Sequence, residues 1–288
     1  MSTIIQRYMD LPKFVNLIQT NSLYLSKMSI FDDKLEGGLT VDDFFIKSNV
    51  PRYFDVLMNL VWPTADSNAE KRAEDNKKAD LIFGELSQKK FDTPFGRYHC
   101  DDTERVFPAC REWLYVNCWH KSNHECAAMW EIFGGDKNSL CVFSTVERLE
   151  TAMTRDKREQ NLEIREVKYL NHAKDIFSDD PLDPFISKSE SYSFEREIRV
   201  ISWDPNINLS DTPSNKESGF LLKVDLTKLI MKVVISPTAD PWFKSTVEEL
   251  CKSAGINNKV KDSALKKQPI TDIFQAMAHR QEYEQGGR

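Results

Sequence analysis

The chain has 288 residues, 40% hydrophobic and 29% charged, with a formal net charge of −6, which suffices for one large folded domain or two small ones. The acidic balance argues against electrostatic wrapping of nucleic acid, although it leaves room for a local basic groove. Because no apolar run is long enough to span a membrane and the N-terminus lacks an apolar signal segment, we expect a cytoplasmic protein with no membrane partner.

The N-terminal part of the chain alternates short strands with a capped helix. The segment Thr3–Met9 is typical of a strand, and Asp10 can cap a helix that carries Pro12 in its first turn. A second strand is expected over Leu23–Ser26, and the acidic loop Phe31–Gly38 follows it. These signals predict a strand–helix–strand unit.

The middle of the chain is helical and polar before it returns to apolar segments. Residues 40–110 form a predicted helical insertion, in which Asp66–Asp80 is dense in charge and typical of a solvated face. The segment Trp113–Trp119 predicts a strand, and His124–Phe133 predicts an amphipathic helix ended by glycines.

The second half of the chain is richer in strands than in helices. Strands are predicted over residues 140–144, 163–170, 195–201, 220–224, 233–236 and 259–264, with a helix over 243–253. Because the strands succeed one another without long helices between them, we predict an α+β fold. We expect one domain over residues 1–270 with a mixed or antiparallel sheet, followed by a polar C-terminal tail over 271–288.

The segment Ser193–Ile201 carries the clearest chemical signal. In a strand, Glu195, Glu197 and Arg199 would share one face. Glutamate is a poor strand former and like charges repel, so this arrangement indicates either ion pairing or chemistry. Ion pairs at a sheet surface would contribute only about 0–1 kcal/mol and would need no function.

Other polar residues also allow two interpretations. Asp32, Asp33 and Glu36 suit either a divalent-cation loop or a helix N-cap cluster, and capping is favoured. Arg7 can equally pair with Asp32 or Glu36. The six cysteines include no Cys-x-x-Cys pair, so we expect free thiols and no metal site.

Several short motifs resemble an uncharacterised bacterial family, catalogued as domain of unknown function two-nine-seven-one, of which some relatives occur in phage-defence loci. Outside residues 40–110 and the tail, the resemblance covers most of the chain. The motifs are Arg7-Tyr8, Ser22–Ser26, Phe31-Asp32-Asp33-x-x-Glu36-Gly37, Ala128-Met129-Trp130-x-x-Phe133-Gly134 and Phe194-Glu195-x-Glu197-x-Arg199.

The order of elements also resembles the ADP-ribosyltransferase fold, which implies a split sheet and NAD as the substrate. The resemblance places Arg7, with its neighbour Tyr8, against the phosphates or ribose of NAD. His120 and Ser122 lie in a turn that would replace the Ser-Thr-Ser element of that fold, and Trp130 would stack near the nicotinamide.

The same resemblance makes Glu195 and Glu197 a catalytic pair, with Glu197 stabilising the oxocarbenium-like transition state and Glu195 orienting or deprotonating the acceptor; the two roles could be exchanged. The implied function is an ADP-ribosyltransferase, a toxin of phage defence that modifies protein or nucleic acid and has a cognate inhibitory protein. Two alternatives stay open. One is a metal-dependent nuclease using both glutamates with Asp32 or Asp33, and the other is a non-catalytic binding module of a defence system.

Overall fold

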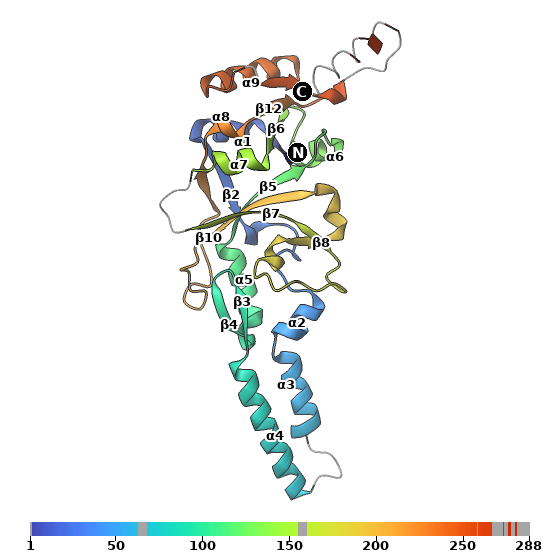
Figure 1. Cartoon of the computed structure of the whole chain (residues 1–288), viewed down its shortest axis with the longest axis vertical. Coiled ribbons are helices and arrows are strands. Elements are labelled where there is room, and N and C mark those ends of the chain that lie inside the picture. Colours follow the sequence, from blue (N-terminus) through green and yellow to red (C-terminus); the bar gives the residue numbers. More distant parts are fainter. Residues whose placement is uncertain are drawn as a thin grey trace.

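The computed structural model describes residues 2–62, 68–154, 160–257 and 259–266, together with positions 273, 276, 277 and 280. Most of the expected tail, 271–288, lies outside the described residues. Within them, the chain forms one α+β domain around a nine-stranded mixed sheet, with a helical arm projecting from one end (Figure 1). The predicted α+β class and single mixed sheet are confirmed.

The sheet is antiparallel except for one parallel pair at its edge, β12 with β13. Its main path runs β11 (Gly219–Lys223), β2 (Ser22–Lys27), β5 (Tyr115–Lys121), β1 (Ile4–Asp10), β6 (Ser139–Thr145), β12 (Lys232–Ile235) and β13 (Val260–Asp262). Off this path, β10 (Glu197–Trp203) pairs with β5 on one edge and with β7 (Asn161–Glu166) on the other.

The central strand β5 is where the sheet divides. One edge of β5 pairs with β10 from Ser202↔Tyr115 to Glu197↔His120. The other edge pairs with β2 only at Tyr115 and Val116, and with β1 only at His120 and Lys121. The strands β1 and β2 therefore separate along the middle of β5 and leave that stretch without a strand partner on this edge.

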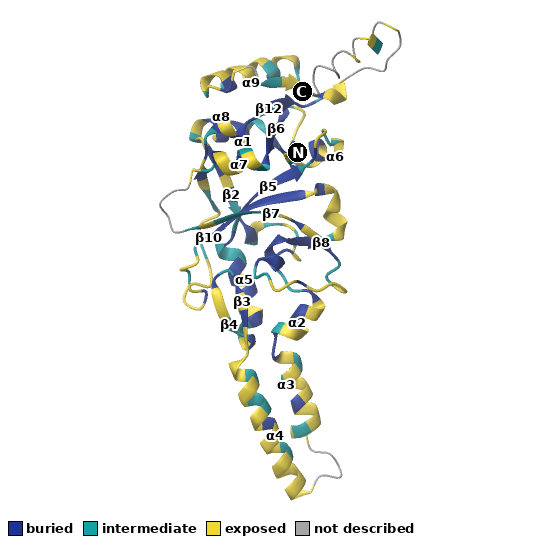
Figure 2. Cartoon of the chain, in the orientation of Figure 1, coloured by how far each residue is buried: buried dark blue, intermediate teal, exposed yellow. Residues whose placement is uncertain are grey.

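Hydrophobic clusters of buried residues hold the helices to the sheet (Figure 2), and the two largest involve most of them. The first packs α1 (Leu11–Thr20), α7 (Val146–Ala152), α8 (Leu226–Leu229) and α9 (Pro241–Ser253) on the strands. The second packs α5 (Thr103–Trp113) beneath β5 and β10. Helix α1 begins as predicted, because the Asp10 side chain accepts a hydrogen bond from the Lys13 N–H.

The remaining helices lie at the periphery. The helices α2 (Val41–Lys47), α3 (Val50–Val56) and α4 (Ala69–Gln88) fall in the region expected as a helical insertion, and α6 (Ala127–Phe133) follows β5. Two small two-stranded sheets, β3 (Lys90–Thr93) with β4 (Gly96–His99) and β8 (Lys168–Leu170) with β9 (Ser187–Ser189), complete the fold. None of the helices in the described residues combines the length and apolar character needed to cross a bilayer.

Four local predictions were wrong. The segment predicted as one strand over 163–170 is divided into β7 and β8, which belong to different sheets. Trp113 ends α5 instead of opening a strand, and β5 begins at Tyr115. The acidic loop caps no helix, because the next helix, α2, is capped by Thr40. In the segment Ser193–Ile201, the strand begins only at Glu197, since residues 190–195 form a 3₁₀ helix.

Candidate functional site

A cavity of about 520 Å³ opens where β1 and β2 separate along β5. Arg7 and Tyr8 from β1, His120 from β5 and both glutamates, Glu195 and Glu197, line this cavity, so the structure brings these five predicted residues together. Asp33 of the acidic loop also lines it. A cavity of 300–1,000 Å³ is the usual size for a small-molecule or cofactor site.

Arg7 is a cation without a counter-ion. The Nη1 atom is buried with no hydrogen-bond partner, and the guanidinium makes no ion pair with any described residue, so the expected pairing with Asp32 or Glu36 is wrong. Burial lowers the pKa of Arg7 to about 10, which still leaves it charged at neutral pH. A buried donor without a partner typically costs about 1–3 kcal/mol, which a bound anion would recover.

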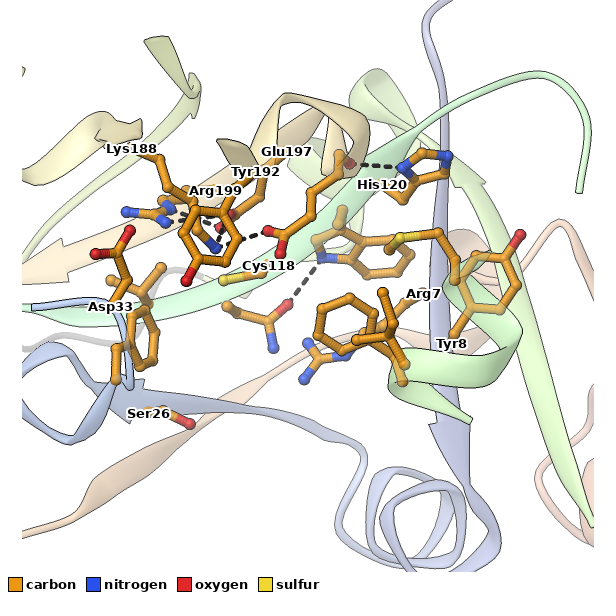
Figure 3. A pocket seen from close by; sticks show the side chains of 18 of the residues that line it. Arg7, Tyr8, Ser26, Asp33, Cys118, His120, Lys188, Tyr192, Glu197 and Arg199 are labelled. Carbon is orange, nitrogen blue, oxygen red and sulfur yellow. Dashed lines mark hydrogen bonds and ion pairs between the residues drawn. The ribbon is translucent and has the colours of Figure 1, made fainter. Parts of the chain in front are cut away.

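Five charged side chains form a cluster across the opening from Arg7 (Figure 3). We call this the charge cluster; it comprises Glu36, Lys188, Glu195, Glu197 and Arg199. Arg199 Nε donates to Glu197 Oε1 at 2.6 Å, and its Nη2 donates to Glu36 Oε2 at 2.9 Å. Lys188 Nζ lies 2.7 Å from Glu195 Oε2 and 3.1 Å from Glu36 Oε1. Three carboxylates thus meet two cations, leaving one excess negative charge.

The two catalytic candidates differ in their electrostatic environment. Burial raises the pKa of Glu195, and the hydrogen bond from Lys188 offsets this only in part. Burial also opposes ionisation of Glu197, but the charge and hydrogen bonds of Arg199 outweigh it and hold the pKa of that carboxyl below its usual value. Glu197 is therefore firmly ionised, whereas Glu195 accepts a proton more readily.

The backbone around these glutamates is held in an unusual conformation. Arg196, between them, adopts φ 43° and ψ 55°, in the left-handed region that non-glycine residues rarely occupy. The Nδ1 atom of His120 lies 2.6 Å from the carbonyl oxygen of Glu195, and the Glu197 N–H donates to the Tyr169 hydroxyl at 2.8 Å. This turn lets both carboxylates reach one cavity although they do not share a strand.

Two of the sequence-predicted residues, Ser122 and Trp130, do not line the cavity, whereas Tyr8 lines it with its hydroxyl already hydrogen-bonded. Trp130 is buried against Tyr8, with ring centroids 4.8 Å apart, and is not among the residues that line the cavity. The hydroxyl of Tyr8 donates to Gln6 at 2.7 Å. Ser122 lies outside the cavity lining, and its hydroxyl donates to the carbonyl oxygen of His124 at 2.7 Å.

Sequence reasoning missed Lys188, and it did not place Glu36 and Asp33 as the fold does. Lys188 lies on a short strand, where no local pattern distinguishes it, and only its three carboxylate neighbours reveal its role. Glu36 was seen as a cap or a cation ligand, but it is buried in the charge cluster. Asp33 accepts the Leu35 N–H with Oδ1 at 2.9 Å, while its Oδ2 is buried without a partner. The glycine that follows Glu36 was the available signal of a tight turn.

No group of three or more His, Cys, Asp or Glu side chains in the described part of the chain is arranged to hold a metal ion. Comparisons of the chain with family models, curated proteins and solved structures found no match. The functional argument therefore depends on the geometry of the cavity itself.

Proposed function

We propose that the chain is an NAD-consuming ADP-ribosyltransferase whose site is the cavity at the split of the sheet. The observation that carries this proposal is the pairing, in one cavity, of an unpartnered Arg7 guanidinium with the acidic side of the charge cluster. NAD has the matching polarity, since its pyrophosphate is anionic and its nicotinamide ring is cationic. A guanidinium suits pyrophosphate because it offers a fork of N–H donors.

The carboxylates fit the charge that develops during the reaction. The bond between nicotinamide and ribose breaks, its electron pair leaves with neutral nicotinamide, and positive charge grows on the ribose. Glu197 is ionised and can stabilise that charge, while the excess negative charge of the cluster adds to the field. The acceptor then attacks the ribose and loses its proton, for which Glu195, with its raised pKa, is the better base.

The free Oδ2 of Asp33 supports a second point of recognition. Figure 3 shows Asp33 and Arg7 toward opposite sides of the cavity, so one extended ligand can reach both. A carboxylate oxygen needs a donor, such as a ribose hydroxyl or the carboxamide N–H of nicotinamide.

Nicotinamide release from NAD by the purified chain is the direct test. We expect Arg7→Lys to lower kcat/KM by about 10- to 100-fold, because a lysine cannot reproduce the bidentate contact. Arg105→Lys is the matched control, since Arg105 is an exposed residue paired with Asp102 at 3.0 Å. We expect Glu195→Gln to lower kcat by roughly 10²- to 10³-fold.

Calorimetric titration of the wild type with NAD completes the design. If the wild type does not bind NAD and releases no nicotinamide, the proposal is refuted and a non-catalytic binding module is favoured. Mg²⁺-dependent loss of nucleic acid with NAD intact would favour the nuclease instead. Transfer of labelled ADP-ribose to protein or to nucleic acid would identify the acceptor class.

A further inference from the structure

A helical arm projects from the end of the molecule opposite α9 (Figure 1). It consists of α3, a π-helical turn over Leu57–Val61 and α4, which packs against both. One face of the first helix supports this packing: Val56 is buried, and the Tyr53 ring meets Phe83 of α4 with centroids 5.6 Å apart. The hairpin is therefore held together by a single face of α3 and its π-helical continuation.

A second apolar face of the same helix is left exposed (Figure 2). We call it the apolar stripe, and its side chains are 40–65% exposed. Its members are Val50, Phe54, Leu57, Met58 and Val61. They recur at intervals of three and four residues, the spacing of one helix face, and Trp62 extends the surface at 68% exposure.

The neighbouring helix has the opposite surface character. The sequence of α4 begins Ala-Glu-Lys-Arg-Ala-Glu-Asp-Asn-Lys-Lys, and its exposed side chains are mainly charged, with Glu74 and Lys78 paired at 2.7 Å. A helix that is apolar on two faces is typical of the interior of a helix bundle, and a charged neighbour is typical of its outside. The contrast within one hairpin indicates that the stripe, and not α4, is the face that another helix covers.

The stripe is large enough for a specific interface. From the usual burial of apolar and aromatic side chains, the stripe and Trp62 together expose roughly 300–600 Å² per chain. The largest apolar patch on a typical monomer is about 300–600 Å² and is often a functional surface. Two copies would bury roughly 600–1,200 Å², which matches the apolar share of a standard interface of about 1,200–2,000 Å².

The order of the stripe residues favours a second copy of this chain as the occupant. Val50, Phe54, Leu57 and Val61 are separated by four, three and four residues, so the pattern reads the same in both directions. This spacing is compatible with a two-fold antiparallel contact, in which residue i of one chain meets residue j of the other and residue j meets residue i. Met58, the fifth member of the stripe, lies outside the symmetric spacing. It would place Val50 of one chain opposite Val61 of the other, and Phe54 opposite Leu57.

The charged residues beside the stripe do not oppose this contact. Arg52 and Asp55 lie between the stripe positions and pair with each other at 2.9 Å, so their charges are already balanced. The stripe itself contains no charged residue.

We infer that the chain forms a two-fold dimer in which the apolar stripes of two arms pack antiparallel, with the α4 helices on the outside of a four-helix arrangement. This inference shares no residue with the cavity and does not depend on the proposed enzymatic function. Sedimentation of the full chain between about 1 and 100 μM tests it. We expect the wild type to sediment at twice the 33.4 kDa chain mass.

Matched substitutions locate the interface. Phe54→Glu should raise the dimer dissociation constant at least about tenfold, because it places a carboxylate in the apolar contact. Trp242→Glu, at an equally exposed aromatic on α9, should leave the dimer intact. Circular dichroism will show that both variants fold, since neither side chain is buried.

Disulfide trapping tests the register. A chain carrying both Val50→Cys and Val61→Cys should form an intermolecular disulfide on mild oxidation, whereas Val50→Cys alone should not. A wild type that stays monomeric at 100 μM would overturn the inference, and so would a dimer that Phe54→Glu does not weaken. A dimer that the paired cysteines fail to trap would overturn the antiparallel register.

Discussion

The carboxylate of Glu197 has a structural role that can be separated from any catalytic one. It is buried and accepts two hydrogen bonds from Arg199, at 2.6 and 3.0 Å, and the arginine is itself fully buried. Removing one partner of a buried ion pair usually costs about 3–5 kcal/mol, because the other charge is left uncompensated. Arg199 keeps Glu36 and the Phe185 carbonyl oxygen, at 2.9 and 3.0 Å, so we expect Glu197→Gln to lose about 3 kcal/mol.

The assay is equilibrium unfolding by urea and by heat, followed by circular dichroism near pH 7.5. A loss of about 3 kcal/mol should lower Tm by roughly 6–12 °C in a domain of this size class. Glu163→Gln is the control, because Glu163 also pairs with an arginine at 2.6 Å but is only partly buried, with 39% of its side chain exposed, and it should cost less than about 1 kcal/mol.

The pH dependence gives an independent check of the same reasoning. Because the pKa of Glu197 is held below its ordinary value near 4.5, its contribution is present above that pH and is lost as the pH falls through the lowered pKa. The gap between the wild type and Glu197→Gln should therefore shrink in acid. Equal stability of the Glu197→Gln and Glu163→Gln variants at pH 7.5 would refute the argument.

Three further predictions concern other residues. Burial lowers the pKa of His120 in the folded protein, against a weaker opposing effect of the Glu195 carbonyl. The protein should therefore lose stability as the pH falls below about 6.5, where the histidine of the unfolded chain takes up a proton more readily than that of the folded chain. Urea titrations at pH 7.0 and 5.5 should show a smaller loss of stability in His120→Gln than in the wild type, and an equal loss would contradict the lowered pKa. Trp130→Phe should lower the free energy of unfolding by about 1–3 kcal/mol through lost packing on Tyr8, and it should leave the KM for NAD unchanged. A raised KM would instead support the stacking of Trp130 near the nicotinamide ring. Gly37 has φ +75°, and a Cβ there would lie 2.8 Å from Arg111 Cγ. Gly37→Ala should therefore lower the free energy of unfolding, measured by thermal melting, by about 1–3 kcal/mol. Gly84→Ala is the control and should not destabilise its helix, because Gly84 is exposed and a Cβ there would meet no neighbouring atom.

Much of the fold follows from local patterns. The strand β1, the Asp10 cap of α1 and the strands β2, β6, β11 and β12 lie close to their predicted ranges, because period-two and period-3.6 hydrophobicity reflect burial directly. The errors occur at boundaries, as at Trp113, where a helix and a strand adjoin in one apolar run.

The candidate site was only partly predictable for the same reason. Five residues named from sequence and motif resemblance are gathered around one cavity by the fold: Arg7, Tyr8, His120, Glu195 and Glu197. The roles of Tyr8, Ser122 and Trp130 could not be judged from residue type, because the direction of a side chain depends on the element that packs against it.

The sequence by itself determined the α+β class, most element positions and the presence of acidic residues near the start of β10, since each depends on neighbours within a few residues. Only the tertiary structure decided which charges meet. Glu36 and Arg199 are 163 positions apart in the chain, and Glu195 reaches the cavity through a left-handed turn at Arg196. Such contacts depend on the path of the whole chain around the divided sheet, and no local spacing encodes that path.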